Sequence, residues 1–140
     1  MSYDLALYQM YLGQVPMFRA CSSEQLDVIA QLGEAVSVPG GSDIVVEGDA
    51  GDGLYLIASG AADVRRSGET VASLKPGDYF GELALFDPAP RNATVHATEP
   101  LSCVRLPRET FIDALDEVPA IRDALLHGMA ARIHELDQRT

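Results

Sequence analysis

The chain has 140 residues, of which 47% are hydrophobic and 22% are charged, and its formal net charge is −11. This length and composition predict one globular domain that buries a core of its own. The acidic charge leaves no basic surface for a nucleic-acid backbone, and no apolar run approaches the roughly 20 residues that span a bilayer, so we expect a soluble, cytoplasmic protein that binds neither nucleic acid nor membrane directly.

Helices are expected at the start of the chain. Residues 3–12 place apolar side chains at near-helical spacing, and a second short helix is expected over about 23–32. Ser22-Ser23-Glu24-Gln25 resembles a capping box, in which Ser22 accepts from the backbone while Gln25 reaches back. Residues 1–33 are therefore interpreted as an N-terminal helical segment.

The middle of the chain, residues 34–106, is predicted to be all β. Short β-prone runs alternate there with turns rich in glycine, and several short strands at such spacing are typical of a sandwich or barrel. A double-sheet jelly roll fits their number. The runs are Ala35–Val38, Ile44–Val46, Leu54–Ile57, Ala62–Arg65, Thr70–Leu74, Arg91–Thr98 and Leu101–Leu106.

Residues 107–140 are predicted to be helical again and complete the single domain 1–140. One helix is expected over about 108–116, and Pro119 can open the last one. An apolar stripe in that last helix would pack on the domain, or serve as a movable lid or a dimer seam; it consists of Ile121, Leu125, Met129, Ile133 and Leu136. Gly128, in mid-helix, weakens the helix by about 1 kcal/mol relative to alanine and could mark a bend.

The stretch from Phe80 to Val95 is the most informative in the chain. Gly81 lets the backbone approach a ligand closely, and the free N–H groups at the start of the following turn can bind an anion. Arg91 opens an alternating run in which it shares a face with three apolar residues, Ala93, Val95 and Ala97. A charge on such a face lies at a frayed edge or meets an anion, and a guanidinium suits phosphate geometry.

Glu82 lies in the same stretch and cannot hold a phosphate. Its expected role is to accept hydrogen bonds from a hydroxyl, such as a ribose 2′-OH, which together with Arg91 describes a nucleotide whose phosphate and ribose lie close together. Two structural alternatives remain. Glu82 could be a helix N-terminal acid stabilised by the dipole, and Arg91 could form an internal ion pair with Glu82.

The joint pattern is far more specific than either residue. Gly81-Glu82-Leu83-Ala84-Leu85, followed by Pro90-Arg91-Asn92-Ala93-Thr94-Val95, resembles the phosphate-binding cassette of cyclic-nucleotide-binding domains. That family includes the regulatory subunits of cyclic-AMP-dependent protein kinase and the catabolite activator proteins of bacteria. The upstream stretch from Glu47 to Ile57, followed by Ser59-Gly60, looks like the glycine-marked strands of the same family, and the likeness covers about residues 12–137.

The resemblance implies an eight-stranded jelly roll with helices at both ends. It also implies a set of ligand contacts: Gly81, Leu83 and Ala84 around the phosphate and ribose, Glu82 on the 2′-OH, Arg91 on the cyclic phosphate, the backbone of Asn92 and Ala93 around the phosphate, and Val71 against the base. Cyclic-AMP sites often have alanine, and cyclic-GMP sites threonine, where this chain has Asn92, so base choice stays open. We expect cyclic AMP, because it is the commoner bacterial ligand and nine arginines against one lysine suggest a bacterial source.

The function expected on this basis is a non-enzymatic sensor that moves its C-terminal helices when a cyclic nucleotide binds and acts on an unidentified protein partner, with no cofactor. No helix-turn-helix is expected, since the chain given reaches only Thr140. One alternative is a structural or interaction module that has lost nucleotide binding. Another is a small metal enzyme, as in cupins, for which the chain offers only His96, His127 and His134.

Overall fold

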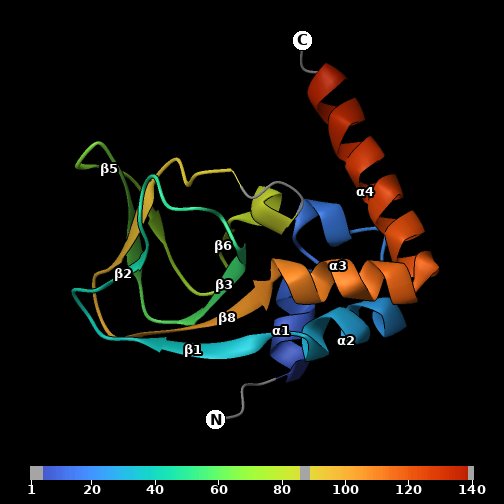
Figure 1. Ribbon diagram of the computed structural model, residues 1–140, viewed down its shortest axis with the longest axis horizontal. Helices are drawn as coiled ribbons and strands as arrows, with labels where there is room; N and C mark the ends of the chain where they lie inside the picture. The colour runs from blue at the N-terminus through green and yellow to red at the C-terminus, as the bar shows by residue number, and fades with distance from the viewer. Residues whose placement is uncertain (1–4, 86–88, 139–140) are drawn as a thin grey trace.

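Two four-stranded antiparallel sheets lie face to face in the computed structural model, and the helices gather on one side of them (Figure 1). The structure describes residues 5–85 and 89–138, apart from the side chains of Leu83, Met129 and residues 131–138. One sheet has the order β1-β8-β3-β6, with strands Glu34–Val38, Leu101–Pro107, Gly53–Ser59 and Tyr79–Phe80. The other has the order β2-β7-β4-β5, with strands Asp43–Val45, Thr94–Ala97, Ala62–Arg66 and Glu69–Leu74. The predicted double-sheet jelly roll is confirmed.

Two strands differ from the prediction. The two-residue strand β6 was not predicted, because two residues carry no readable alternation. Strand β7 begins at Thr94, three residues later than expected. The preceding backbone pairs elsewhere, since the N–H of Arg91 donates to the carbonyl of Asp49 at 2.7 Å. The expected alternation of faces nevertheless holds, with Ala93, Val95 and Ala97 buried.

The helices are close to the predicted ones. They are α1 (Leu5–Leu12), the 3₁₀ turn η1 (Pro16–Phe18), α2 (Ser23–Gln31), α3 (Arg108–Glu117) and α4 (Pro119–Gln138). The capping box of α2 is present as predicted. The N–H of Gln25 donates to the Ser22 hydroxyl at 3.1 Å, and the N–H of Ser22 donates to the Gln25 side-chain oxygen at 2.8 Å.

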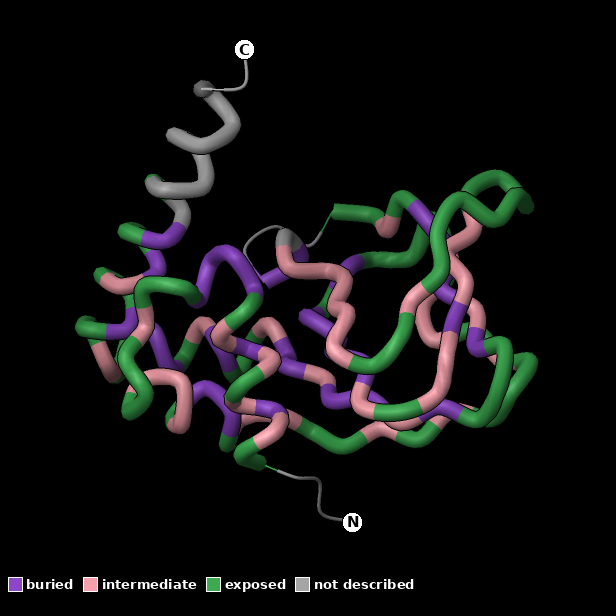
Figure 2. Tube along the Cα trace, turned by 180° about the vertical axis from the view of Figure 1, so that it is seen from behind, coloured by how far each residue is buried: buried purple, intermediate pink, exposed green. Residues whose placement is uncertain are grey.

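Strand β3 separates two hydrophobic cores. Its alternate residues Leu54 and Leu56 face the helices, whereas Tyr55 and Ile57 face the second sheet. Because both faces are covered, the strand reads as a continuous apolar run. Figure 2 shows buried segments gathered where the helices meet the sheet, while the outer tips of the sandwich are exposed. The inter-sheet core is the one that continues into the candidate site.

Helix α4 rests on the turn η1 through a close backbone contact. A Cβ added to Gly128 would come within 2.6 Å of the Met17 carbonyl oxygen, so the absence of a side chain lets the two segments approach. Ile121 and Leu125 of the predicted stripe are buried in the helix-facing core. The side chains of Met129, Ile133 and Leu136 lie outside the described part, and the lid or dimer role of the stripe remains a prediction.

Two kinds of feature are absent from the residues that the structure describes. No helix among them is both long and apolar enough to cross a bilayer. No group of three histidine, cysteine or acidic side chains among them is close enough together to hold a metal ion. His96 lies beside Asp43 instead, with Nδ1 2.8 Å from a carboxylate oxygen.

Candidate functional site

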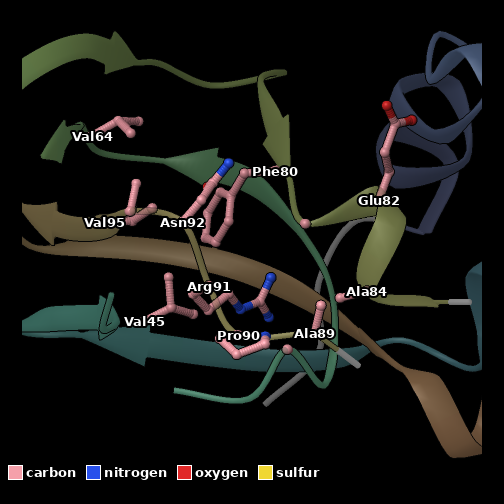
Figure 3. Close-up of a pocket in the computed structure, with 13 residues that line it drawn as sticks. Val45, Val64, Phe80, Glu82, Ala84, Ala89, Pro90, Arg91, Asn92 and Val95 are labelled. Carbon is pink, nitrogen blue, oxygen red and sulfur yellow. The ribbon is translucent and has the colours of Figure 1, made fainter. Parts of the chain in front are cut away.

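A cavity of about 430 Å³ opens between the second sheet and the segment that joins β6 to β7. This volume is in the range of small-molecule sites. Its walls are mostly apolar, with one arginine, one glutamate and one asparagine among them (Figure 3). The lining residues are Val45, Gly51, Val64, Phe80, Gly81, Glu82, Ala84, Ala89, Pro90, Arg91, Asn92, Ala93 and Val95.

The backbone of Arg91 is clamped by the loop between β2 and β3. Its N–H donates to the Asp49 carbonyl at 2.7 Å, and its own carbonyl accepts from the N–H of Gly48 at 2.8 Å. Two residues further along each segment, the N–H of Gly51 donates to the Ala89 carbonyl at 3.1 Å. The loop and the segment 89–91 therefore form a short two-stranded contact that fixes where the Arg91 side chain starts.

The Arg91 side chain is also held on several sides. One terminal nitrogen, Nη2, donates to the carboxylate of Asp52 at 3.1 Å and to the Gly53 carbonyl at 3.2 Å. The guanidinium carbon lies 5.7 Å from the centre of the Tyr55 ring, within cation–π range. Only 9% of the side chain is exposed. The sequence-based alternative of an ion pair with Glu82 is not what the structure shows, since the paired carboxylate is that of Asp52.

Gly81 is required by the position of Arg91. Its φ of +82° lies in the left-handed region, which disfavours any side chain. A Cβ there would also collide with a terminal nitrogen of Arg91 and would come within 2.7 Å of the Gly53 carbonyl oxygen. The sequence suggested that Gly81 brings backbone close to a ligand. The structure adds that it makes room for the arginine.

Glu82 and Ala84 lie in the next turn, the four-residue 3₁₀ helix η2 (Glu82–Leu85). Ala84 is buried against the cavity wall, and its N–H donates to the Gly81 carbonyl at 3.0 Å. The carboxylate of Glu82 points away from Arg91 (Figure 3). Leu83 belongs to the same turn, but its side chain lies outside the described part.

Asn92 and Ala93 follow the arginine and line the cavity with it. Ala93 is buried, whereas Asn92 is exposed at the rim. The Asn92 carbonyl accepts a hydrogen bond from Nε of Arg66 at 3.2 Å, which steadies the backbone at this point. Six of the residues predicted for the site, Gly81, Glu82, Ala84, Arg91, Asn92 and Ala93, are thus brought together around one cavity.

Val71 is the predicted contact that the structure leaves apart. It lies on the edge strand β5, where the register with β4 shifts, and 51% of it is exposed. It does not line the cavity in this structure, whereas Val64 of β4 does. A contact of Val71 with a base therefore stays a prediction.

Sequence reasoning missed the residues that hold the arginine. Asp52 and Tyr55 lie three positions apart, whereas Phe80 comes from a later strand. The Tyr55 and Phe80 rings are stacked, with centroids 5.0 Å apart and planes 4° from parallel. Burial, and then the nearby Asp52, raises the pKa of the Tyr55 hydroxyl above its ordinary value. The available signal was the Gly-Asp-rich stretch 47–53 directly before a buried strand.

Fold and cavity together define a class of protein: a jelly-roll ligand-binding domain with a clamped arginine in an apolar cavity. The family model of the cyclic nucleotide-binding domain matches residues 35–118, more than half of the chain. The chain belongs to the cyclic nucleotide-binding domain family.

Two curated relatives and one solved structure show the extent of the likeness. A cAMP-dependent protein kinase regulatory subunit of Aspergillus niger is 39% identical over 117 residues, which cover 82% of this chain and 28% of the relative. A cGMP-dependent protein kinase of Toxoplasma gondii is 34% identical over 140 residues, 98% of this chain and 14% of the relative. The N-terminal domain of a transcriptional regulator from Streptomyces coelicolor superposes with a TM-score of 0.85 at 29% identity, over 91% of this chain and 95% of that one. This chain thus spans less than a third of each of the two curated relatives.

Proposed function

We propose that this regulatory domain binds cyclic AMP in the cavity and passes the event on by moving its C-terminal helices. The observation that carries the proposal is Arg91, a nearly buried cation that lines an apolar cavity. The loop between β2 and β3 holds its backbone in place. A small anion that enters the cavity meets a positive charge already in place. Such a charge-assisted contact is among the strong polar interactions in proteins.

The proposal gives a role to each predicted residue that lines the cavity. Arg91 takes the cyclic phosphate, and the backbone at Ala93 lies beside it. Glu82 takes the ribose 2′-OH after its side chain turns toward the cavity, since its carboxylate points away from Arg91. Ala84 and Leu83 pack around the ribose.

The base is expected at the rim, beside Asn92. The amide of Asn92 can both donate and accept, so it can pair with the amino group of adenine or with the carbonyl of guanine. We favour cyclic AMP, in keeping with the curated relative that is a regulatory subunit of a cAMP-dependent kinase. Titration with both nucleotides decides the point, because a tighter cyclic GMP complex would reverse the assignment.

The route from the cavity to the C-terminal helices runs through η2. Helix α3 contacts η2, which forms one wall of the cavity, and α4 contacts η1. A ligand that pulls Glu82 and the η2 turn inward therefore changes the surface on which α3 rests. Binding shifts this equilibrium only if the ligand has different affinities for the two arrangements. The domain signals without catalysis, to a protein that contacts the helices.

Calorimetric titration of wild type and Arg91→Ala with cyclic AMP tests the proposal. We expect the substitution to cost about 2–5 kcal/mol of binding, as for breaking a buried charge pair. Arg65→Ala is the matched control. Arg65 follows the cavity residue Val64 but lies on the opposite face of β4, where it pairs with Asp63 at 3.7 Å. Equal affinity of wild type and Arg91→Ala would overturn the assignment of the site to Arg91. No binding by wild type would favour the alternative of a module without nucleotide binding.

A further inference from the structure

A row of four side chains crosses the sheet β1-β8-β3-β6 at the level of the cavity. In the strand register, Glu34 is opposite Arg105, Arg105 is opposite Tyr55, and Tyr55 is opposite Phe80. Residues directly opposite each other in antiparallel strands share a face. The row therefore lies on the face that meets the second sheet, with Phe80 in the cavity wall at one end and Glu34 on the edge strand β1 at the other.

Arg105, in the middle of this row, shares a carboxylate with the arginine of the cavity. Asp52 accepts from Nη2 of Arg91 through Oδ1 at 3.1 Å and from Nη2 of Arg105 through Oδ2 at 2.8 Å. The other terminal nitrogen of Arg105 donates to Glu34 at 3.0 Å. The result is a continuous chain of charges, Glu34–Arg105–Asp52–Arg91, that ends in the cavity.

The four charges of this chain cancel one another. Arg91 and Asp52 alone sum to zero, and Glu34 would make the group −1 in a protein whose net charge is already −11. Arg105 returns the group to zero. Burial lowers the pKa of the Arg105 guanidinium, but its interactions with Asp52, Tyr55 and Glu34 together outweigh burial and raise that pKa.

We propose that Arg105 is a positioning residue for anion binding: it holds Asp52 where that carboxylate aims Arg91 into the cavity, and it offsets the negative charge of Asp52. Arg105 does not line the cavity and does not touch the ligand. Asp52 is 54% exposed and would swing freely if only one arginine held it, whereas two donors on its two oxygens fix the plane of the carboxylate. This inference rests on the proposed function, because it concerns the affinity of the same cavity.

A double-mutant cycle tests the proposal by calorimetric titration with cyclic AMP and cyclic GMP. The variants are Arg105→Gln, Asp52→Asn and the two combined, each checked for cooperative thermal unfolding. We expect Arg105→Gln to weaken binding about tenfold when Asp52 is present, in the range of coupled contacting residues, and less than about twofold in the Asp52→Asn background. A role in folding alone would lower the unfolding temperature and leave the affinity of the folded protein unchanged.

Glu34→Gln provides a variant with the opposite sign and little risk to folding, since Glu34 is exposed on an edge strand. We expect it to tighten binding about twofold, because it removes a negative charge from the same chain of charges while Arg105 stays in place. The positioning role would be overturned by wild-type affinity in Arg105→Gln, or by an equal loss of affinity in both Asp52 backgrounds. The proposed function would still stand in that case if Arg91→Ala lost affinity. No binding by wild type would overturn both.

Discussion

The two polar sides of the cavity are built in opposite ways. On the side proposed for the phosphate (the phosphate side), Arg91 is fixed by backbone hydrogen bonds to Gly48 and Asp49, by the Asp52 carboxylate and by the Tyr55 ring. On the side proposed for the ribose hydroxyl (the hydroxyl side), Glu82 stands on a four-residue 3₁₀ turn and its carboxylate points away from Arg91. The proposed binding of a cyclic nucleotide would use Arg91 where it lies, whereas it would require the Glu82 side chain to turn.

The difference predicts that the phosphate side contributes most to affinity and the hydroxyl side most to the conformational change. A preorganised group gives affinity, because little side-chain freedom is lost when the ligand binds. A group that must turn toward the ligand costs affinity, but its movement distinguishes the bound from the free state. Since η2 contacts α3, the side that is proposed to move is also the side in contact with the C-terminal helices.

The largest expected effect comes from disturbing the preorganised side at Gly81. In Gly81→Ala the new methyl group would displace the Arg91 guanidinium and the strained φ would add about 1–3 kcal/mol. We expect affinity for a cyclic nucleotide to fall at least about 100-fold, or roughly 3 kcal/mol. Calorimetric titration measures the loss.

Gly68→Ala is the matched control for Gly81→Ala. Gly68 has nearly the same φ, +83°, but a Cβ there meets nothing within 4 Å. The control should therefore be destabilised by backbone strain without losing affinity. Similar affinities in the two variants would show that Arg91 is not held in place through Gly81.

A smaller effect is expected on the side that rearranges. Glu82→Ala should weaken the binding of cyclic AMP by about 1.5 kcal/mol, the low end for a hydrogen bond to a charged group. The low end is expected because turning the Glu82 side chain in wild type offsets part of the free energy of that hydrogen bond. The 2′-deoxy analogue should bind wild type with the same loss and should not distinguish wild type from Glu82→Ala. Glu99→Ala, an exposed acid between β7 and β8, is the control. An additive loss would mean that Glu82 does not meet the 2′-OH.

Much of this arrangement could be predicted from local pattern. The alternation after Arg91 placed Ala93, Val95 and Ala97 in the core, and the capping box placed the start of α2. These features depend on neighbours in the sequence. The partner of Arg91 does not, because Asp52 lies 39 positions away and meets it only through the pairing of two loops.

Strand register also determines positions that alternation alone could not give. Val71 lies at an irregularity between β4 and β5, so its facing could not be read from alternation. Phe80 lies in the cavity wall because its strand pairs with β3, where Phe80 is opposite Tyr55. A strand of two residues is too short for its pairing to be predicted from the sequence. Motif resemblance pointed to the segment that lines the cavity, whereas the residues that support it depend on long-range register.

The smallest effect tests whether the phosphate side is as rigid as its contacts imply. Cys103 packs in the same inter-sheet core as Tyr55, and burial raises the pKa of its thiol to about 11. A thiol reagent at pH 8 should therefore label Cys21→Ser, in which Cys103 is the remaining cysteine, far more slowly than Cys103→Ser, in which the half-buried Cys21 remains. Cyclic AMP should leave the slow rate unchanged.

The same pKa predicts a pH dependence of stability. The folded-state pKa lies above the ordinary thiol value of 9, so the contribution of Cys103 to folding is present below pH 9 and is lost as the pH rises toward 11. The free energy of unfolding should fall over that interval less steeply in Cys103→Ser than in wild type. In the labelling experiment, rapid reaction of native Cys103 at pH 8, or slow reaction only when ligand is present, would mean that the core beneath Arg91 opens in the free protein. The phosphate side would then be organised by the ligand as well.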